Sequence, residues 1–149
     1  MASLAVSFVN VSLRSEYALR AVFDLASHPP DTPVKIADIA KRQNVPQKFL
    51  QLILADLKQA GLVESRRGVE GGYLLARPPE AIRVGDVTRL FETPRNEKTR
   101  TRRRAESPFS DLWRRVNHAV SGVLDQTSFA DLRKAYETGH SRYVPDWVI

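Results

Sequence analysis

The fold of this chain is decided by residues 36–76, which read IADIAKRQNVPQKFLQLILADLKQAGLVESRRGVEGGYLLA. Residues 36–43 have the apolar spacing of a short helix, and the connection Asn44-Val45-Pro46 ends it because proline cannot continue a helix. A longer helix is predicted over residues 47–60. Gly61 is typical of the residue that follows the end of a helix.

Extended chain follows this pair of helices. Residues 62–66 and 73–76 have the composition of short strands, and the arginine- and glycine-rich stretch 67–72 lies between them. This pattern predicts a β-hairpin. Two flanking helices are also predicted, one over residues 12–27 with Ser12 as its N-cap, and one over residues 84–91 with Val84, Val87, Leu90 and Phe91 facing inward.

Helix, short helix, tight turn, helix and hairpin is the order of a winged helix-turn-helix, in which the helix after the turn enters the major groove of DNA. The exposed N-terminal end of that helix would offer Gln47, Lys48 and Gln51. Glutamine can read an adenine edge with two hydrogen bonds, and lysine can bind guanine or phosphate. These three residues are therefore candidates for DNA binding, and the alternative is a solvated helix face.

The predicted hairpin would form the wing. Arg66 and Arg67 precede the turn, and Gly71 is one of its glycines, which let a backbone lie close to phosphate. Arginine inserted into a narrow minor groove responds to groove width and negative potential. We therefore predict DNA contacts by these three residues, against the alternative of surface arginines in a mobile turn. A phosphate-binding P-loop is disfavoured, because no strand–loop–helix arrangement accompanies the glycines.

The most regular apolar pattern lies near the C-terminus. Ser107-Pro108 predicts a helix start, and the helix would run from Pro108 to Gln126. A stripe this continuous favours pairing with a second copy, and burial against the chain's own domain is the alternative. A last short helix, residues 129–136, would be capped by Thr127 or Ser128. The residues predicted to dimerise are Phe109, Leu112, Trp113, Val116, Val120 and Val123.

The predicted fold class is mainly α with a small β-hairpin, a winged helix-turn-helix plus a long dimerisation helix. The 149 residues amount to about one domain. We expect an N-terminal arm and DNA-binding domain over 1–92, a basic loop over 93–106, and the dimerisation helix, a short helix and a tail over 107–149. The net charge of +6 is concentrated in residues 95–104, RNEKTRTRRR. Such a run binds phosphate or stays solvated.

Composition argues against several classes of protein. The chain has no cysteine, which removes disulfides, thiolate metal sites and thiol nucleophiles. His28, His118 and His140 lie far apart, and no nucleophile has a base at motif spacing, so neither a metal site nor an enzyme is predicted. The longest uncharged run, residues 1–13, is too short to span a bilayer and lacks the basic start of a secretory signal. We expect a cytoplasmic protein with no membrane partner.

Five stretches together resemble one family of bacterial regulators. Over about residues 12–132 the chain is similar to the winged helix-turn-helix family of IscR, NsrR and CymR. The resemblance implies a homodimeric transcription factor whose long helices cross and present two winged domains to a palindromic operator in double-stranded DNA. The stretches are EYALRAVFDLA at 16–26, IADIAKRQ at 36–43, FLQLILADLKQAGLV at 49–63, RGVEGGYLLA at 67–76 and VGDV at 84–87.

The family's residue roles carry over to a few positions. Its base-reading positions fall on Lys48 and Gln51, and its wing arginine falls on Arg67, in agreement with the choice made above from groove chemistry. The serine that caps the family's recognition helix is Pro46 here, which implies the loss of a hydroxyl contact to phosphate.

The family's cofactor does not carry over. Members that bind an iron–sulfur cluster have three cysteines between the short helix and the long one, completed by a histidine or by a carboxylate from the first helix. Here the loop is shorter, the last cysteine and the histidine fall on Ser107 and Ser110, and Glu16 stands where some members have the carboxylate. We therefore expect no cofactor, because one carboxylate cannot hold a cluster.

Two other function classes stand beside a DNA-binding regulator. A winged fold can serve as a protein-interaction module, as CymR is controlled by an enzyme partner. An enzyme is disfavoured by the lack of a supported catalytic group. The effector is open: a small molecule between the long helix and the winged domain, a partner protein, or none. Neither the operator nor the sign of regulation follows from the sequence.

Overall fold

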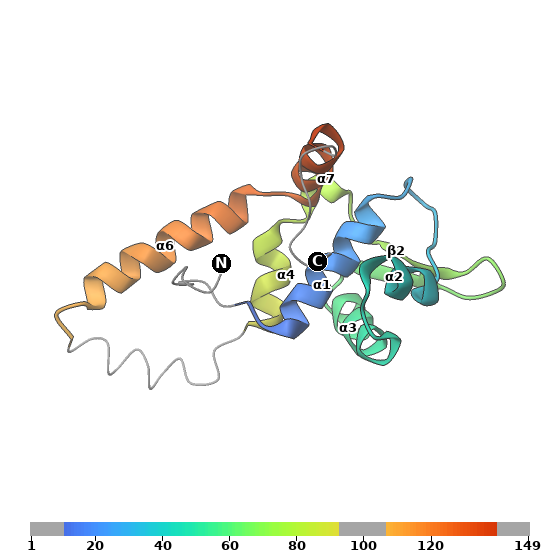
Figure 1. The fold of residues 1–149 in the computed structure, drawn as a ribbon, viewed down its shortest axis with the longest axis horizontal. Coiled ribbons are helices and arrows are strands. Elements are labelled where there is room, and N and C mark those ends of the chain that lie inside the picture. Colours follow the sequence, from blue (N-terminus) through green and yellow to red (C-terminus); the bar gives the residue numbers. More distant parts are fainter. Residues whose placement is uncertain (1–10, 93–106, 140–149) are drawn as a thin grey trace.

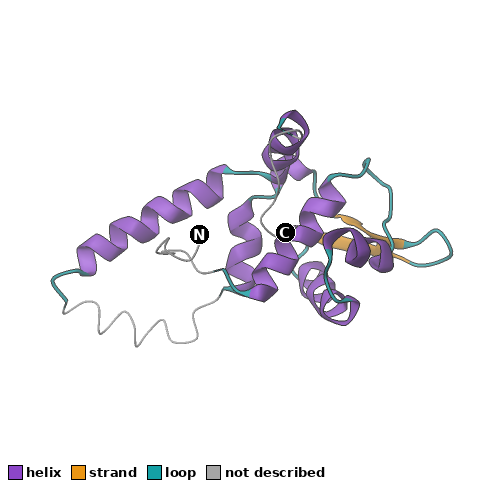
Figure 2. Ribbon diagram, in the orientation of Figure 1, coloured by secondary structure: helices purple, strands orange, loops and turns teal. Residues whose placement is uncertain are grey.

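The computed structural model describes residues 11–92 and 107–139 of the chain. The N-terminal arm, the basic run 95–104 and the C-terminal tail lie outside the described residues. Helices predominate, and two strands form an antiparallel hairpin (Figures 1 and 2), which confirms the predicted fold class. In chain order the elements are α1 (Leu13–Ala26), α2 (Ile36–Gln43), α3 (Gln47–Gln59), β1 (Val63–Arg66), β2 (Gly72–Leu75), the 3₁₀ helix η2 (Pro79–Ala81), α4 (Val84–Phe91), α6 (Ser110–Gln126) and α7 (Phe129–Thr138).

Helix α1 lies at the centre of the winged domain, in contact with α2, α3, α4, α7 and β2 (Figure 1). Ser12 caps its start as predicted, because the Ser12 hydroxyl accepts a hydrogen bond from the Ser15 N–H at 3.2 Å. Mostly small side chains on its inner faces let several neighbours approach the helix axis. The buried apolar residues of α1 are Ala18, Ala21, Val22, Leu25 and Ala26.

Helices α2 and α3 form the predicted helix-turn-helix. Asn44 ends α2 in the left-handed conformation, with φ of 53°. Val45 is buried, and Pro46 occupies the cap position of α3 without a side-chain hydrogen bond. Helix α3 buries one apolar face, as its spacing predicted. That face consists of Leu50, Ile53, Leu54 and Leu57.

The hairpin is joined by a third segment of chain. Strands β1 and β2 are antiparallel, with Arg66 opposite Gly72. Val34, in the connection between α1 and α2, exchanges two backbone hydrogen bonds of 2.8 Å with Tyr73. Gly72 has φ of 152°, and a Cβ there would overlap the Val34 carbonyl oxygen. The glycine is therefore required for this close approach.

Helix α6 leaves the body beside α4 (Figure 1). The Arg89 Nη2 and Asp125 Oδ2 atoms are 2.6 Å apart. The Val84 N–H donates to the Thr127 carbonyl at 2.9 Å. Gly85 permits this packing, because a Cβ there would overlap Asp125 Oδ1. The C-terminal end of α6 is therefore held against α4.

Two predictions about this part of the chain were wrong. Helix α6 begins at Ser110 rather than at Pro108. The Ser107 hydroxyl accepts from the Phe109 N–H at 3.1 Å and the Ser107 carbonyl accepts from the Ser110 N–H at 3.1 Å, which makes a separate turn before the helix. Leu90, expected to face inward, is exposed at the rim of a shallow cavity of about 310 Å³. The cavity is also lined by Asp56, Gln59 and Ala60.

One hydrophobic core joins α1, α2, α3, α4, the hairpin and the start of α7. Phe129 of α7 is fully buried in this core. Ser128, one of the two predicted caps, closes the start of α7 in a capping box with Asp131. Helix α6 contributes no buried residue to the core.

Candidate nucleic-acid interface

The three polar residues predicted for the recognition helix lie on the surface of α3. Gln47, Lys48 and Gln51 are exposed, whereas the opposite side of the helix is buried in the core. The first turn of α3 contains no acidic residue. Hydrogen-bonding groups and positive charge are thus presented outward at the helix end that would enter a groove.

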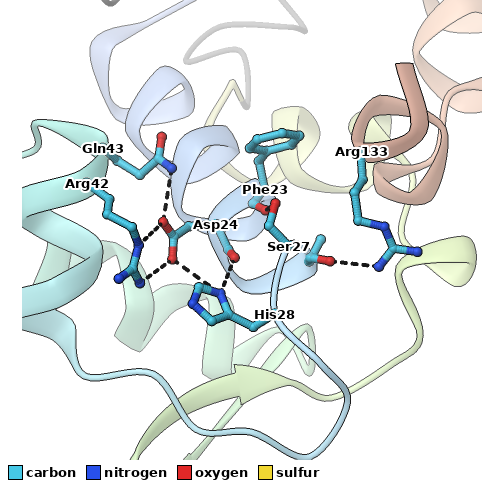
Figure 3. A network of polar contacts seen from close by, with 8 residues as sticks. Phe23, Asp24, Ser27, His28, Arg42, Gln43 and Arg133 are labelled. Carbon is cyan, nitrogen blue, oxygen red and sulfur yellow. Dashed lines mark hydrogen bonds and ion pairs between the residues drawn. The ribbon is translucent and has the colours of Figure 1, made fainter. Parts of the chain in front are cut away.

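A buried carboxylate fixes the helix-turn-helix to α1. Asp24 is 3% exposed and accepts hydrogen bonds from Arg42 Nε and Nη2, both at 2.9 Å, and from Gln43 Nε2 at 3.0 Å (Figure 3). The hydrogen bond to Asp24 raises the pKa of Arg42 above its ordinary value, as expected for a charge-assisted contact. Both donors belong to the last turn of α2. The contact therefore orients α2 on α1 and, through the short turn, α3.

Two further contacts bind the end of α1 to its surroundings (Figure 3). The His28 Nδ1 atom lies 2.7 Å from the Asp24 carbonyl oxygen. Arg133 of α7 donates to the Ala26 carbonyl at 2.8 Å. None of these contacts was predicted. Those that Arg133 and Arg42 make join residues far apart in the sequence, which a local pattern does not reveal.

The wing presents the predicted arginines. Arg66 ends β1, Arg67 follows it, and both are exposed on a hairpin that extends away from the body (Figure 1). Lys58 Nζ donates to Ser65 Oγ at 2.7 Å and connects α3 to β1. Arg66 Nη2 lies 3.6 Å from Asp31 Oδ1 in the loop after α1. The two arginines thus have different electrostatic surroundings.

Gly71 differs from the other predicted wing residues because it is buried. A Cβ at this position would overlap the Arg66 carbonyl oxygen. The Gly71 N–H donates to the Gly68 carbonyl at 3.0 Å, and Gly68 has φ of 107°. The structure gives Gly71 a role in closing the turn, and through the turn in positioning the arginines.

Two large apolar side chains on α3 were missed. Phe49 is 56% exposed and Leu52 is 65% exposed. The rotation of about 100° per residue in a helix is the signal that finds them, because it sets both outside the buried stripe of α3.

The predicted dimerisation residues share one face of α6, and the described chain leaves most of that face open. Phe109, just before the helix, and Leu112, Trp113 and Val123 within it are exposed. Val116 and Val120 are half-buried. Figure 1 shows α6 as an arm that projects from the winged domain. Its apolar face would remain in contact with water in an isolated copy.

The residues present do not fit an iron–sulfur cluster of the family's kind. Such clusters are held mainly by cysteine thiolates, and the chain has no cysteine. The Ser110 hydroxyl donates to the Ser107 carbonyl at 2.8 Å, so both serines take part in the turn before α6. Glu16 is already paired with Arg20, whose Nη2 is 2.5 Å from Glu16 Oε1. This cation would oppose a metal at the carboxylate.

Over residues 11–92 and 107–139, no three histidine, aspartate or glutamate side chains are grouped as a metal site requires. No helix in the same ranges has the length and apolar composition for a membrane crossing.

A helix-turn-helix with an exposed polar recognition helix, followed by a hairpin bearing arginines, defines a winged-helix DNA-binding regulator. A comparison with family models agrees with this class. Residues 11–135 match the Rrf2 model, which is described as an iron-dependent transcriptional regulator. The chain belongs to the Rrf2 family.

Individual relatives give the same result. The chain is 34% identical to the HTH-type transcriptional regulator CymR of Bacillus subtilis, over 83% of this chain and 89% of CymR. The solved structure of IscR from T. potens is similar with a TM-score of 0.75 and 33% identity, covering 95% of this chain and 96% of IscR. The structure of B. subtilis CymR, the global cysteine regulator, is similar with a TM-score of 0.71 and 32% identity, covering 85% and 98%.

These comparisons confirm the resemblance and the class that follows from it. The protein is a DNA-binding transcriptional regulator of the Rrf2 family and not an enzyme.

Proposed function

We propose that the protein acts as a homodimer on a palindromic operator and does so without an iron–sulfur cluster. Two copies would pair through α6, so that two winged domains face successive turns of one duplex. A cytoplasmic location follows from this function, because the operator is chromosomal. The division into a DNA-binding part, 1–92, and a dimerising part, 107–149, belongs to the same proposal.

The observation that carries the proposal is the open apolar face of α6. Leu112, Trp113 and Val123 are exposed on a helix that buries no residue of its own. A two-fold axis would bring this face against its copy and remove both from water at once. The winged domain needs no such completion, because its core is already closed.

Each DNA-facing residue has a distinct chemical role in the proposal. Gln47 and Gln51 would read base edges in the major groove, and Lys48 would bind guanine or phosphate. Arg66 and Arg67 would enter the minor groove or bind phosphate beside it, at a turn that Gly71 closes.

A regulator without a cluster would differ from the iron-dependent regulators after which the family is described. The proposal is supported by the lack of cysteine and by the Arg20 guanidinium at Glu16. The regulatory signal would then be a small molecule or a partner protein, or the protein would bind its operator constitutively.

One experiment tests the DNA function and its residues together. Purified protein is incubated with genomic fragments, and bound fragments are sequenced for the wild type and for the Gln51→Ala and Arg67→Ala variants. We expect enrichment of one palindrome by the wild type and weaker or relaxed enrichment by the variants. Recovery of no palindrome contradicts the proposal and favours a protein-interaction module. Equal enrichment by all three proteins contradicts the residue assignment alone.

A separate spectrum tests the cofactor. Protein purified without oxygen should show no visible absorption, and a brown protein would contradict a cluster-free regulator.

A further inference from the structure

We propose that Leu52 is a specificity-determining residue that contacts the C5-methyl group of a thymine in each operator half-site. The inference rests on the proposed DNA-binding function and assigns one of its base contacts to an apolar side chain. None of the polar residues considered above supplies this kind of recognition.

The position of Leu52 on α3 is the first step. At about 100° per residue, Leu52 lies opposite the stripe of Leu50, Ile53, Leu54 and Leu57 that faces the core. It is 65% exposed in the winged domain. The side chain is therefore free of the core and directed outward with the polar recognition residues.

The neighbours of Leu52 point to DNA as the occupant of this surface. Lys48 is one helical turn before Leu52 on the same face, and Phe49 is its exposed neighbour three residues back. The acidic residue of this helix, Asp56, is one helical turn after Leu52 on the same face, and its charge is paired with Arg14 at 3.1 Å. The face around Leu52 thus combines a lysine and an ion pair with two exposed apolar side chains, on the outer side of the helix that enters the major groove in a winged helix-turn-helix.

The chemistry of the groove selects the base. Thymine alone among the four bases presents a methyl group in the major groove, and apolar side chains recognise it by contact. Adenine or guanine at that position would place its N7 acceptor against leucine. Burying that nitrogen without a hydrogen bond costs free energy. Leu52 would therefore favour thymine over the purines by exclusion and over cytosine by contact.

The test removes the methyl group without touching any hydrogen bond. The operator recovered by fragment selection is synthesised with thymine, and again with deoxyuridine at each thymine of the half-sites in turn. Binding is measured by fluorescence anisotropy for the wild type, Leu52→Ala and Gln51→Ala. Melting curves of the three proteins establish equal folding, which is expected because both positions are exposed.

We expect one thymine per half-site to be sensitive in the wild type. Loss of one buried methyl should weaken binding by about fourfold, and by about fifteenfold when both half-sites are changed. Leu52→Ala should bind the thymine operator more weakly and respond to deoxyuridine by less than about twofold. Gln51→Ala, the matched control, should keep the full deoxyuridine effect.

Three results would overturn the inference. If the wild type binds the thymine and deoxyuridine operators with equal affinity, there is no methyl contact. If Leu52→Ala keeps the full deoxyuridine effect, another residue makes the contact. In both cases an enriched palindrome leaves the proposed DNA function intact. Failure to recover any operator overturns the proposed function and this inference together.

Discussion

The winged domain and helix α6 are built in opposite ways. The winged domain surrounds α1 with neighbours and closes a core that contains fully buried residues such as Leu54 and Val87. Helix α6 is longer than any helix of that domain, and it buries none of its residues. A single copy therefore stabilises its DNA-facing half internally, while its second half depends on contact with another surface.

Mutations in these two regions should therefore have different effects, one on the folding of a single copy and the other on the association of two copies. A change in the winged core acts on each copy alone, whereas in the proposed dimer a change on α6 would act through a partner and thus through protein concentration.

Truncation of the winged core should have the largest effect. Leu54→Ala removes a fully buried side chain from α3, and we expect a loss of about 2–5 kcal/mol in the free energy of unfolding. Denaturant titration at two protein concentrations measures it. Leu112→Ala on α6 is the control, because its effect should depend on concentration and that of Leu54→Ala should not. The same dependence on protein concentration in both variants would contradict this difference between the winged core and α6.

A charge on the open face of α6 should break the dimer. Trp113→Asp would bury a carboxylate against an apolar partner twice, once for each copy. We expect the dimer dissociation constant, measured by sedimentation equilibrium, to rise by at least about 100-fold, or about 2.7 kcal/mol. Arg114→Asp, on the opposite side of the same helix, should leave association nearly unchanged. Dissociation by both variants would mean that net charge, and not the apolar face, governs pairing.

The two DNA-contacting elements should differ in kind. Gln51→Ala should relax preference at one base pair, at a cost of about 1–3 kcal/mol on the preferred sequence. Arg67→Ala should weaken binding to matched and mismatched duplexes, most where the minor groove is narrow, and reduce the slope of log affinity against log salt by about one per protomer. Anisotropy titrations on matched and mismatched duplexes at several salt concentrations distinguish these outcomes. A sequence-independent effect of Gln51→Ala would remove it from base recognition.

The smallest effect should come from the junction of α4 and α6. The hydrogen bond from Arg89 lowers the pKa of the Asp125 carboxyl below its usual range. Such a carboxylate stabilises the fold above its unfolded pKa of about 3.9, and this contribution is lost as the pH falls through the lower folded value. Asp125→Asn should therefore lower the melting temperature slightly at pH 7, and by progressively less as the pH falls below about 3.9. A difference that persists in acid would show that the charge is not its cause.

The winged domain was predictable because its signals are local. Proline and asparagine at 44–46 separate α2 from α3, Gly61 ends α3, and the apolar spacing of each helix identified its buried face. Helix α6 was predicted less well. The Ser107-Pro108 signal is real, but its hydrogen bonds form a separate turn, so that the helix begins at Ser110.

Long-range contacts could not be predicted from such signals. The carboxylate of Asp24 accepts a hydrogen bond from Arg42 of another helix. Gly85 lies against Asp125, a residue far along the chain, at a distance that leaves no room for a Cβ. The exposure of Leu52 could have been found, because the same helical spacing that identified the core residues excludes it from them. A search of the recognition helix that is limited to polar residues finds its glutamines and lysines and misses this leucine.

The attachment of α6 at Asp125 and Thr127 has a mechanical consequence. A helix of 17 residues is about 25 Å long, and these bonds hold it near one end. A tilt of about 10° at that end would displace the other by about 4 Å, which is comparable to the rise of one base pair in DNA. In the proposed dimer, the spacing between half-sites that a pair of these arms can span would therefore be set by a few atoms around Gly85, at a distance from every base they help to select.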